Sequence, residues 1–265
     1  MSKVPVANKQ LGQHYLKDQN VIKKICTNFS EQAEVIIEIG PGPGVLTQQL
    51  AATGKPLYLI EKDTRFRDIL LNLCPEDHVY FTDAMDFYWE EFFKKHQLHG
   101  KKIWLVSNLP YNISSQLFIS FITLPDIAYM TLMFQKEVAE KIAPPLHQKN
   151  SMSSLAVYGH LFFETKLLVK VSPGAFLPPP KVDSQVLSFI RHQNIAEVAD
   201  FKNLEKFSRI LFSQKRKQLG TVLKALAPIE KLTLILERCK ISPQIRAEAL
   251  DVKEVLALYH ELKAE

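Results

Sequence analysis

The feature that most constrains the fold is a strand, a glycine-rich loop and a helix in direct succession. Residues 34–39 (EVIIEI) have the pattern of a buried strand, and residues 40–44 (GPGPG) follow at once. The helical pattern VLTQQLAAT comes next and is stopped by Gly54. This order is typical of the first βα unit of a nucleotide-binding sheet, where glycine lets the backbone approach a ligand or adopt positive φ.

The composition of the loop favours a ligand without a phosphate. The loop is not a G-x-G-x-x-G motif, and Pro41 and Pro43 lack the amide donors that would cradle a phosphate. We therefore expect a nucleoside ligand, for which S-adenosylmethionine is the obvious candidate. The alternative is an ordinary turn rich in glycine and proline.

Acidic residues follow the next two predicted strands. The strand at residues 56–60 leads to Glu61, 21 residues after Gly40, which is where an acid binds the ribose hydroxyls in nucleotide-binding sheets. The strand at residues 78–81 leads to Asp83, which we expect to accept a hydrogen bond from an adenine amine. The alternative for Glu61 is a surface position, and for Asp83 it is the N-cap of a following helix.

A fourth predicted strand, at residues 101–106, leads into the sequence Ser-Asn-Leu-Pro-Tyr-Asn. Asn108 offers an amide donor and a carbonyl acceptor, and Tyr111 offers a flat ring on which a base can stack. An acceptor beside an aromatic ring suits the exocyclic amine of a purine that has left its stack. The alternative is a structural turn between strand and helix, since Asn-x-Pro is common in turns.

Polar or glycine residues thus end four predicted strands, and a helical pattern follows each of them. This alternation predicts an α/β fold with a doubly wound parallel sheet. Ligands bind outside the carboxyl ends of the strands in such sheets, so we expect the four residues to share one site: Gly40, Glu61, Asp83 and Asn108.

The pattern changes after residue 191. We predict a first domain at residues 1–191, a polar linker at 192–200 and a small helical domain at 196–265. From Lys202 to Lys224 there are seven lysines and arginines and one glutamate, so this segment carries +6, against +5 for the whole chain. We expect the basic domain to contact RNA phosphates, chiefly through Lys215, Arg216 and Lys217. The alternative is a solvated helix face.

The cysteines and the apolar runs exclude several classes of protein. The three cysteines lie far apart in the sequence and none has metal-ligand spacing, so we expect reduced thiols in the cytoplasm and no metal. No apolar run reaches the ~18–20 residues that a membrane-spanning helix needs, so we expect no membrane partner. A monomer is expected.

These motifs together resemble the small-subunit ribosomal RNA adenine dimethyltransferases. The matching pieces run in the family's order from residue 9 to about residue 217: LGQHYL, EIGPGPGVLT, Glu61, DAM, NLPYNIS, FQKEVA, FLPPPKVDS and FSQKRK. The pair NLPYNIS and FLPPPKVDS is highly specific, and it resembles the 16S enzymes more than the 23S resistance branch. The resemblance implies a class I, Rossmann-like methyltransferase domain that uses S-adenosylmethionine.

The resemblance also implies roles for individual residues. Gly40 would approach the methionine part of the donor, and Asn108 would lie between donor and target. His14 stands where some members have Asn, and the segment after Asn150 departs from the family pattern. The residues implied to bind the methyl donor are His14, Leu16, Gly40, Glu61, Asp83 and Asn108.

The implied reaction is methylation of N6, twice on each of two adjacent adenines near the 3′ end of 16S ribosomal RNA in the small subunit. The Asn108 side chain and the Leu109 carbonyl would accept hydrogen bonds from N6 and favour the pyramidal amine that attacks. Tyr111 and Phe176 would hold the base by stacking, although Phe176 is alternatively a core residue. We expect positioning to supply much of the rate and no side chain with a shifted pKa to act as a general base.

Two other functions are compatible with parts of the sequence. The chain could act chiefly as a ribosome-assembly or RNA-binding factor, although the intact sequence at residues 108–111 argues against lost activity. A DNA adenine methyltransferase usually has Asp-Pro-Pro-Tyr at this place, whereas this chain has Asn-Leu-Pro-Tyr.

Overall fold

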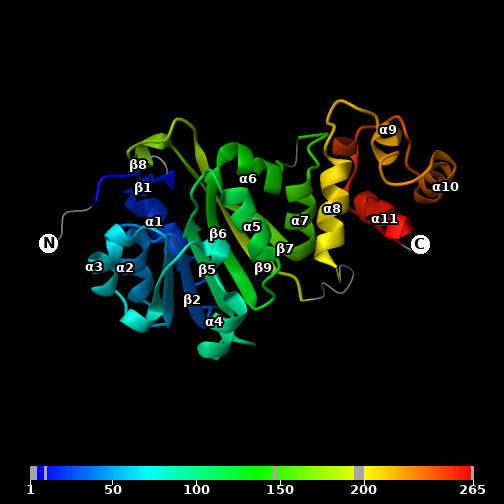
Figure 1. Ribbon diagram of the computed structural model, residues 1–265. Coiled ribbons are helices and arrows are strands. Elements are labelled where there is room, and N and C mark those ends of the chain that lie inside the picture. The colour runs from blue at the N-terminus through cyan, green and yellow to red at the C-terminus, as the bar shows by residue number, and fades with distance from the viewer. Residues whose placement is uncertain (1–4, 9–10, 146–147, 194–199, 264–265) are drawn as a thin grey trace. The chain divides into compact units, whose positions relative to one another are not determined.

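The computed structural model describes residues 5–8, 11–145, 148–193 and 200–263, which divide into two compact units (Figure 1). The first unit comprises Met1–Ala139 and Glu164–Arg191, and the second comprises Glu140–Phe163 and His192–Glu265. The predicted division into residues 1–191 and 196–265 differs from these units, because residues 140–163 group with the C-terminal helices. Residues 194–199, which include most of the predicted linker and the predicted start of the second domain, lie outside the described residues.

Among its described residues, the first unit contains a seven-stranded sheet with the order β4-β3-β2-β5-β6-β9-β7. Neighbouring strands from β4 to β6 pair in parallel, whereas β9 pairs antiparallel to β6. The predicted α/β fold is confirmed, and the doubly wound parallel part extends from β4 to β6 of what is a mixed sheet. The strands are β2 (Val35–Ile39), β3 (Leu57–Glu61), β4 (Val79–Phe81), β5 (Ile103–Asn108), β6 (Ile127–Gln135), β7 (Phe163–Val171) and β9 (Ser184–Arg191).

The strand order reverses between β2 and β5. From β2 the chain continues outward through β3 to β4, and it then returns to the other side of β2 to add β5 and β6. At such a reversal the connections leave the sheet toward opposite faces, which opens a crevice at the carboxyl ends of the two strands. The fold therefore places its ligand crevice beside the glycine loop after β2 and the polar residues after β5.

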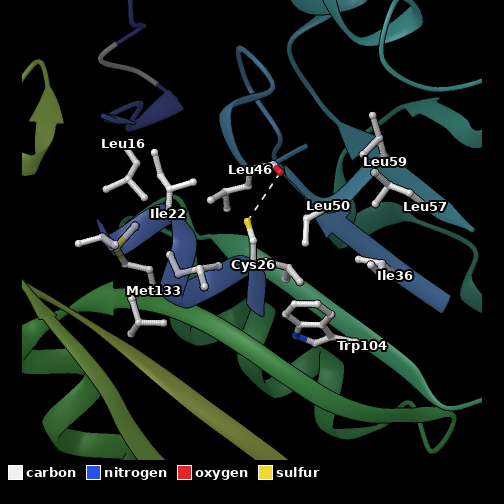
Figure 2. Close-up of a cluster of buried hydrophobic side chains, with 14 of the residues drawn as sticks. Leu16, Ile22, Cys26, Ile36, Leu46, Leu50, Leu57, Leu59, Trp104 and Met133 are labelled. Carbon is white, nitrogen blue, oxygen red and sulfur yellow. Dashed lines mark hydrogen bonds between the residues drawn. The ribbon is translucent and has the colours of Figure 1, made fainter. Parts of the chain in front are cut away.

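Helices cover both faces of the sheet. On one face, the side chains of Ile22 and Leu46 pack with strand residues such as Ile36, Leu59 and Trp104 in one buried cluster (Figure 2). The helices on this face are α1 (Gln19–Thr27), α2 (Val45–Ala51) and α3 (Arg67–Leu71).

The opposite face is packed mainly by aromatic side chains. The ring of Phe118 lies 5.3 Å from that of Phe189, and the ring of Phe92 meets Tyr58 edge-on at 5.1 Å, centroid to centroid. Tyr58 and Leu59 are consecutive on β3, so their side chains point to opposite faces. Phe92 belongs to α4 (Trp89–Lys95) and Phe118 to α5 (Ser114–Ile122), the helices on this face.

The loop between β2 and α2 depends on glycine for its path. Gly40, Gly42 and Gly44 have φ values of +65°, +54° and +78°, in the region that side-chain-bearing residues rarely adopt. Gly44 forms the N-cap of α2, and its N–H donates to the carbonyl of Pro41 at 3.0 Å. The sequence prediction that glycines shape this turn is confirmed.

The second unit is helical in its described part. Asp251 and Glu254 form a capping box, in which each residue's backbone N–H donates to the other's carboxylate at 2.8 Å. The ring of Tyr158 lies 5.2 Å from that of Phe201, which ties residues 140–163 to the C-terminal helices. The helices are α7 (Ser154–Phe162), α8 (Phe201–Leu211), α9 (Leu219–Leu223), α10 (Ile229–Cys239) and α11 (Val252–Lys263), while α6 (Lys136–Ile142) begins in the first unit and ends in the second.

Among the described residues, no helix is both long enough and apolar enough to cross a membrane.

We expect Gly44→Ala to destabilise the first unit more than Gly54→Ala does. Both glycines have positive φ (+78° and +71°), so either substitution costs on the order of 1–2 kcal/mol of backbone strain. A methyl group on Gly44 would also lie 2.5 Å from Cδ1 of Leu73, whereas a methyl on Gly54 would meet nothing within 4 Å.

Urea unfolding followed by tryptophan fluorescence measures this difference, because Trp89 and Trp104 are the chain's two tryptophans and both lie in the first unit. Equal losses of unfolding free energy in the two variants would mean that the Leu73 side chain moves aside at no cost. Backbone strain at positive φ would then be the whole effect.

Candidate functional site

A pocket opens at the carboxyl ends of β2, β3, β4 and β5, and residues 11–16 of the N-terminal segment also line it. Each element contributes the residue that the sequence singled out there. The structure thus brings together Gly40, Glu61, Asp83 and Asn108, as the spacing predicted. The other expected donor-binding residues, His14 and Leu16, line the same pocket.

Glu61 is buried, with 5% of the residue exposed, and its carboxylate is held by backbone amides. The N–H of Gly42 donates to Oε2 at 2.8 Å, and the N–H of Asp63 donates to Oε1 at 2.7 Å. Burial raises the pKa of Glu61 above its ordinary value, and these two amides oppose the rise. Each oxygen accepts one of these bonds and has a second lone pair, so the carboxylate can also accept from a diol in the pocket.

Asp83 serves as an N-cap and also lines the pocket. Its Oδ1 accepts from the N–H of Met85 at 3.0 Å, at the start of the short helix η4 (Ala84–Asp86). Its Oδ2 lies 2.7 Å from Nζ of Lys62, and this hydrogen bond with Lys62 lowers the pKa of Asp83. The N-cap alternative for Asp83 is therefore present in the structure, and binding of an adenine amine by the same carboxylate stays a prediction.

Asn108 ends β5 with its side chain directed to the N-terminal segment. Its Nδ2 donates to the backbone carbonyl of His14 at 2.9 Å. Among the residues that the structure describes, none donates a hydrogen bond to Asn108 Oδ1, which leaves this oxygen able to accept one. The neighbouring Leu109 lines the pocket, while its side chain is 1% exposed and belongs to the core.

Tyr111 is half-buried beside Asn108, and its ring already has a stacking partner. The His14 ring lies 5.5 Å away at an interplanar angle of 25°. The Tyr111 hydroxyl forms a hydrogen bond with Ser184 Oγ at 2.6 Å, which fixes the direction of the ring. A stacking role toward a target base stays a prediction, and it must use a part of the ring that His14 leaves free.

Phe176 does not offer a stacking face, contrary to the expectation that it contacts the target base. It is 1% exposed and belongs to the buried cluster that includes Leu16. It lies on β8 (Phe176–Leu177), which pairs antiparallel to β1 (Tyr15–Leu16) with Leu16 opposite Phe176. The alternative interpretation, a core residue, describes the side chain, because Phe176 is buried in the same cluster as its cross-strand partner Leu16.

Glu38 is a pocket residue that the sequence analysis missed. It is 1% exposed, and its Oε2 accepts a hydrogen bond from Thr47 Oγ1 of α2 at 2.7 Å. Burial raises the pKa of Glu38 to about 8, and the nearby Glu61 carboxylate adds to the rise. The signal in the sequence was a single acid inside an otherwise apolar strand directly before the glycine loop.

The raised pKa of Glu38 does not make it a general base, and the expectation that no side chain with a shifted pKa acts as one stays a prediction. Because its carboxyl is protonated at neutral pH, it does not act as a general base there. Its hydrogen bond with Thr47 instead joins β2 to α2 directly beneath the glycine loop.

The basic residues expected to contact RNA lie in the second unit. Lys215, Arg216 and Lys217 occupy an exposed turn after α8 and before α9. Lys215 is 3.8 Å from a carboxylate oxygen of Glu248, with 71% of its side chain exposed. Such an exposed pair is weak, so the charges of this turn are available to a partner.

The shape and chemistry of the pocket fit a nucleoside-type donor. A Cβ placed on Gly40 would meet nothing within 4 Å, so the backbone here leaves open space that a ligand can fill. The buried carboxylate of Glu61 and the half-buried carboxylate of Asp83 supply acceptors for ribose hydroxyls and for an adenine amine. Among the described residues, no group of His, Cys, Asp and Glu side chains could hold a metal ion.

Comparisons with known proteins point to one family. The family model described as "Ribosomal RNA adenine dimethylase" matches residues 5–264. A "Ribosomal RNA small subunit methyltransferase A" from Caulobacter vibrioides is 35% identical over 96% of this chain and 96% of its own length. The sequence resemblance is thereby confirmed.

Solved structures agree on the fold. A dimethyladenosine transferase from Plasmodium falciparum superposes with a TM-score of 0.75 at 26% identity, covering 92% of this chain and 96% of its own. The 23S rRNA methyltransferase ErmE has a TM-score of 0.66 at 21% identity, covering 94% of this chain and 99% of its own, and it shares the fold. The expected class I methyltransferase fold is confirmed.

The raised pKa of Glu38 predicts a pH-dependent effect of Glu38→Gln on stability. The pKa of Glu38 is about 8 in the folded state against 4.5 for the free side chain. The stabilisation that comes with its bound proton is complete below the unfolded pKa and is lost as pH rises through the folded pKa. The Gln variant cannot titrate, and its amide oxygen can still accept from Thr47.

Urea unfolding of the two proteins from pH 5 to pH 9 measures the effect. As pH rises, the wild type should lose stability relative to the variant. The difference between their free energies of unfolding should change by up to about 1.4 kcal/mol per pH unit. A difference that stays constant over this range would mean that Glu38 is ionised throughout.

Proposed function

The chain belongs to the ribosomal RNA adenine dimethylase family, and we propose that it transfers methyl groups from S-adenosylmethionine to N6 of two adjacent adenines near the 3′ end of 16S ribosomal RNA in the small ribosomal subunit. The observation that carries the proposal is the position of Asn108. Its side chain lies at a pocket that also contains two acidic strand ends, and its Nδ2 is held by His14. Because Nδ2 is engaged, the side-chain oxygen is the group of Asn108 left to accept a hydrogen bond, which supports a role as acceptor for an adenine amine.

In this proposal the residues around the pocket bind the donor in three parts. Glu61 accepts from the ribose hydroxyls, Asp83 accepts from the adenine amine, and the backbone at Gly40 lies against the methionine part. Leu16, which pairs with Phe176 across the strands, covers the ligand together with His14. When bound, S-adenosylmethionine supplies an electrophilic methyl group on a sulfonium centre.

The protein's contribution to the reaction is to prepare the amine. The N6 lone pair of adenine is delocalised into the ring and is a poor nucleophile. Acceptance of N6–H bonds by Asn108 Oδ1 and the Leu109 carbonyl favours the pyramidal amine whose lone pair is localised. Much of the rate acceleration comes from holding this amine in line with the methyl group. Tyr111 orients the base by stacking on it.

The second unit would bind the RNA. Its exposed turn with Lys215, Arg216 and Lys217 carries three positive charges, and phosphate contacts of this kind dominate nucleic-acid affinity. We infer that this unit docks the small subunit while the first unit methylates, and that the chain acts as a monomer in the cytoplasm.

Transfer of labelled methyl groups from S-adenosylmethionine to 30S particles that lack the modification tests this function. Particles of the 50S subunit and duplex DNA are included, and nucleosides are identified by mass spectrometry. Dimethyladenosine only in the small-subunit RNA is the expected result. Label in 50S RNA would contradict the assigned substrate, and particles that are bound without any label would make the chain a binding factor.

Replacing Asn108 by Ala should lower turnover far more than donor binding. Loss of a hydrogen bond made to the reacting group costs roughly 10²–10³-fold in rate, whereas Glu61 and Asp83 still hold the donor. Single-turnover rates and the Kd for S-adenosylmethionine measure the two effects separately. Asn72→Ala, at an exposed residue after α3, is the matched control. Equal losses of binding and turnover in Asn108→Ala would remove Asn108 from the role assigned to it.

Replacing Lys215, Arg216 and Lys217 together by Ala should weaken binding to 30S particles and flatten its dependence on salt. Each lost phosphate contact lowers the slope of log K against log salt by about 0.7–0.9, so the triple variant should lose roughly 2–3 from the slope. The control variant replaces Lys94, Lys101 and Lys102, which lie on α4 and at the amino end of β5, away from the pocket edge. An unchanged slope in the first variant would show that its charges are merely solvated.

A further inference from the structure

Gln13 is the centre of a hydrogen-bond cluster beside the pocket. Its Nε2 donates to Oδ2 of Asp63 at 2.8 Å. Its Oε1 accepts from the backbone N–H of Asn8 at 2.8 Å and from the hydroxyl of Tyr15 at 2.9 Å, and Nη2 of Arg65 lies 3.4 Å away. One amide side chain thus joins the N-terminal segment to the loop after β3.

Asp63 is a buried anion that this cluster compensates. It is 6% exposed, and Nε of Arg65 donates to its Oδ1 at 2.8 Å. The Arg65 guanidinium holds the pKa of Asp63 at about 2 against the effect of burial, and the hydrogen bond from Gln13 contributes. The carboxylate is therefore ionised at neutral pH, and a buried charge is costly when one of its partners is lost.

The same residues connect to Glu61 on one side of the pocket and, through His14, to Asn108 on the other. The N–H of Asp63 donates to Glu61 Oε1 at 2.7 Å, so Asp63 also orients the carboxylate proposed to bind ribose. On the other side of Gln13, the carbonyl of His14 accepts from Asn108 Nδ2 at 2.9 Å. The His14 ring is fixed in turn, because its Nδ1 lies 2.8 Å from the carbonyl of Pro178.

We infer that Gln13, Asp63 and Arg65 form a latch that holds residues 11–16 across the donor pocket and so positions Asn108 for the target amine. These are positioning residues. Asp63 and Arg65 lie outside the pocket lining, and the side chain of Gln13, although Gln13 lines the pocket, is engaged by Asn8, Tyr15 and Asp63. The inference rests on the proposed function, because it assigns the latch to the same donor and amine. A latch of this kind accounts for the hydrogen bond between the buried Asp63 and Gln13 of the N-terminal segment.

The latch predicts a coupled loss of donor affinity and turnover. Without the Gln13 amide, residues 11–16 lose an anchor at the Glu61 end, and the His14 carbonyl no longer holds Asn108 in one orientation. A hydrogen bond to a carboxylate is worth about tenfold or more in an equilibrium. We therefore expect Gln13→Met and Asp63→Asn each to weaken donor binding about tenfold and to lower the single-turnover rate as well.

The experiment is a double-mutant cycle on the full-length protein. The Kd for S-adenosylmethionine is measured by calorimetry for Gln13→Met, Asp63→Asn and the double variant. The double variant should bind no more weakly than the worse single variant, because both substitutions act on the same contact between Gln13 and Asp63. The control is Asp68→Asn, at an exposed residue of α3, whose effect should be near zero and should add to that of Gln13→Met.

Hydrogen exchange without any donor provides the readout that is independent of activity. The backbone amides of residues 11–16 should exchange at least tenfold faster in Gln13→Met and Asp63→Asn than in the wild type, while those of β2 and β5 keep their protection. Unchanged exchange with unchanged donor Kd would overturn the latch. If the wild type binds no donor at all, the proposed function fails, and the exchange result still decides whether the cluster holds the segment.

Discussion

The site depends on the reversal of strand order between β2 and β5. Because the connections on either side of that point leave the sheet toward opposite faces, the carboxyl ends of the two strands border an open crevice. The chain can leave β2 only by a tight turn, and the positive φ values of Gly40, Gly42 and Gly44 make that turn possible. The residues proposed to bind the donor and to position the target amine lie around this one gap.

Three buried or nearly buried carboxyl groups lie close to the crevice, and each is stabilised differently. Glu38 keeps its proton and bonds to Thr47, Glu61 is held by backbone amides, and Asp63 is paired with Arg65. The differences matter for function. A neutral Glu38 can support the glycine loop without repelling its neighbours, Glu61 has lone pairs left for a ligand, and the charge of Asp63 can anchor the N-terminal segment.

Much of the site could be predicted from sequence because its parts are local. Gly40, Glu61, Asp83 and Asn108 each follow a recognisable strand, and the parallel arrangement of strands brings their ends together whatever the details of packing. Apart from Glu38, whose signal was local, the features that were missed depend on contacts between distant parts of the chain. Phe176 is buried because β8 pairs with β1, and Gln13 meets Asp63 across 50 residues of sequence. No periodicity indicates such pairings, and the grouping of residues 140–163 with the C-terminal helices was missed for the same reason.

A structure of the protein bound to S-adenosylhomocysteine, the demethylated donor, tests the central claim most directly. The claim predicts that the ribose hydroxyls lie within hydrogen-bonding distance of Glu61, that the adenine lies beside Asp83, and that the sulfur faces Asn108. A nucleoside bound outside this pocket would contradict it. So would a nucleoside bound inside the pocket with its sulfur directed away from Asn108.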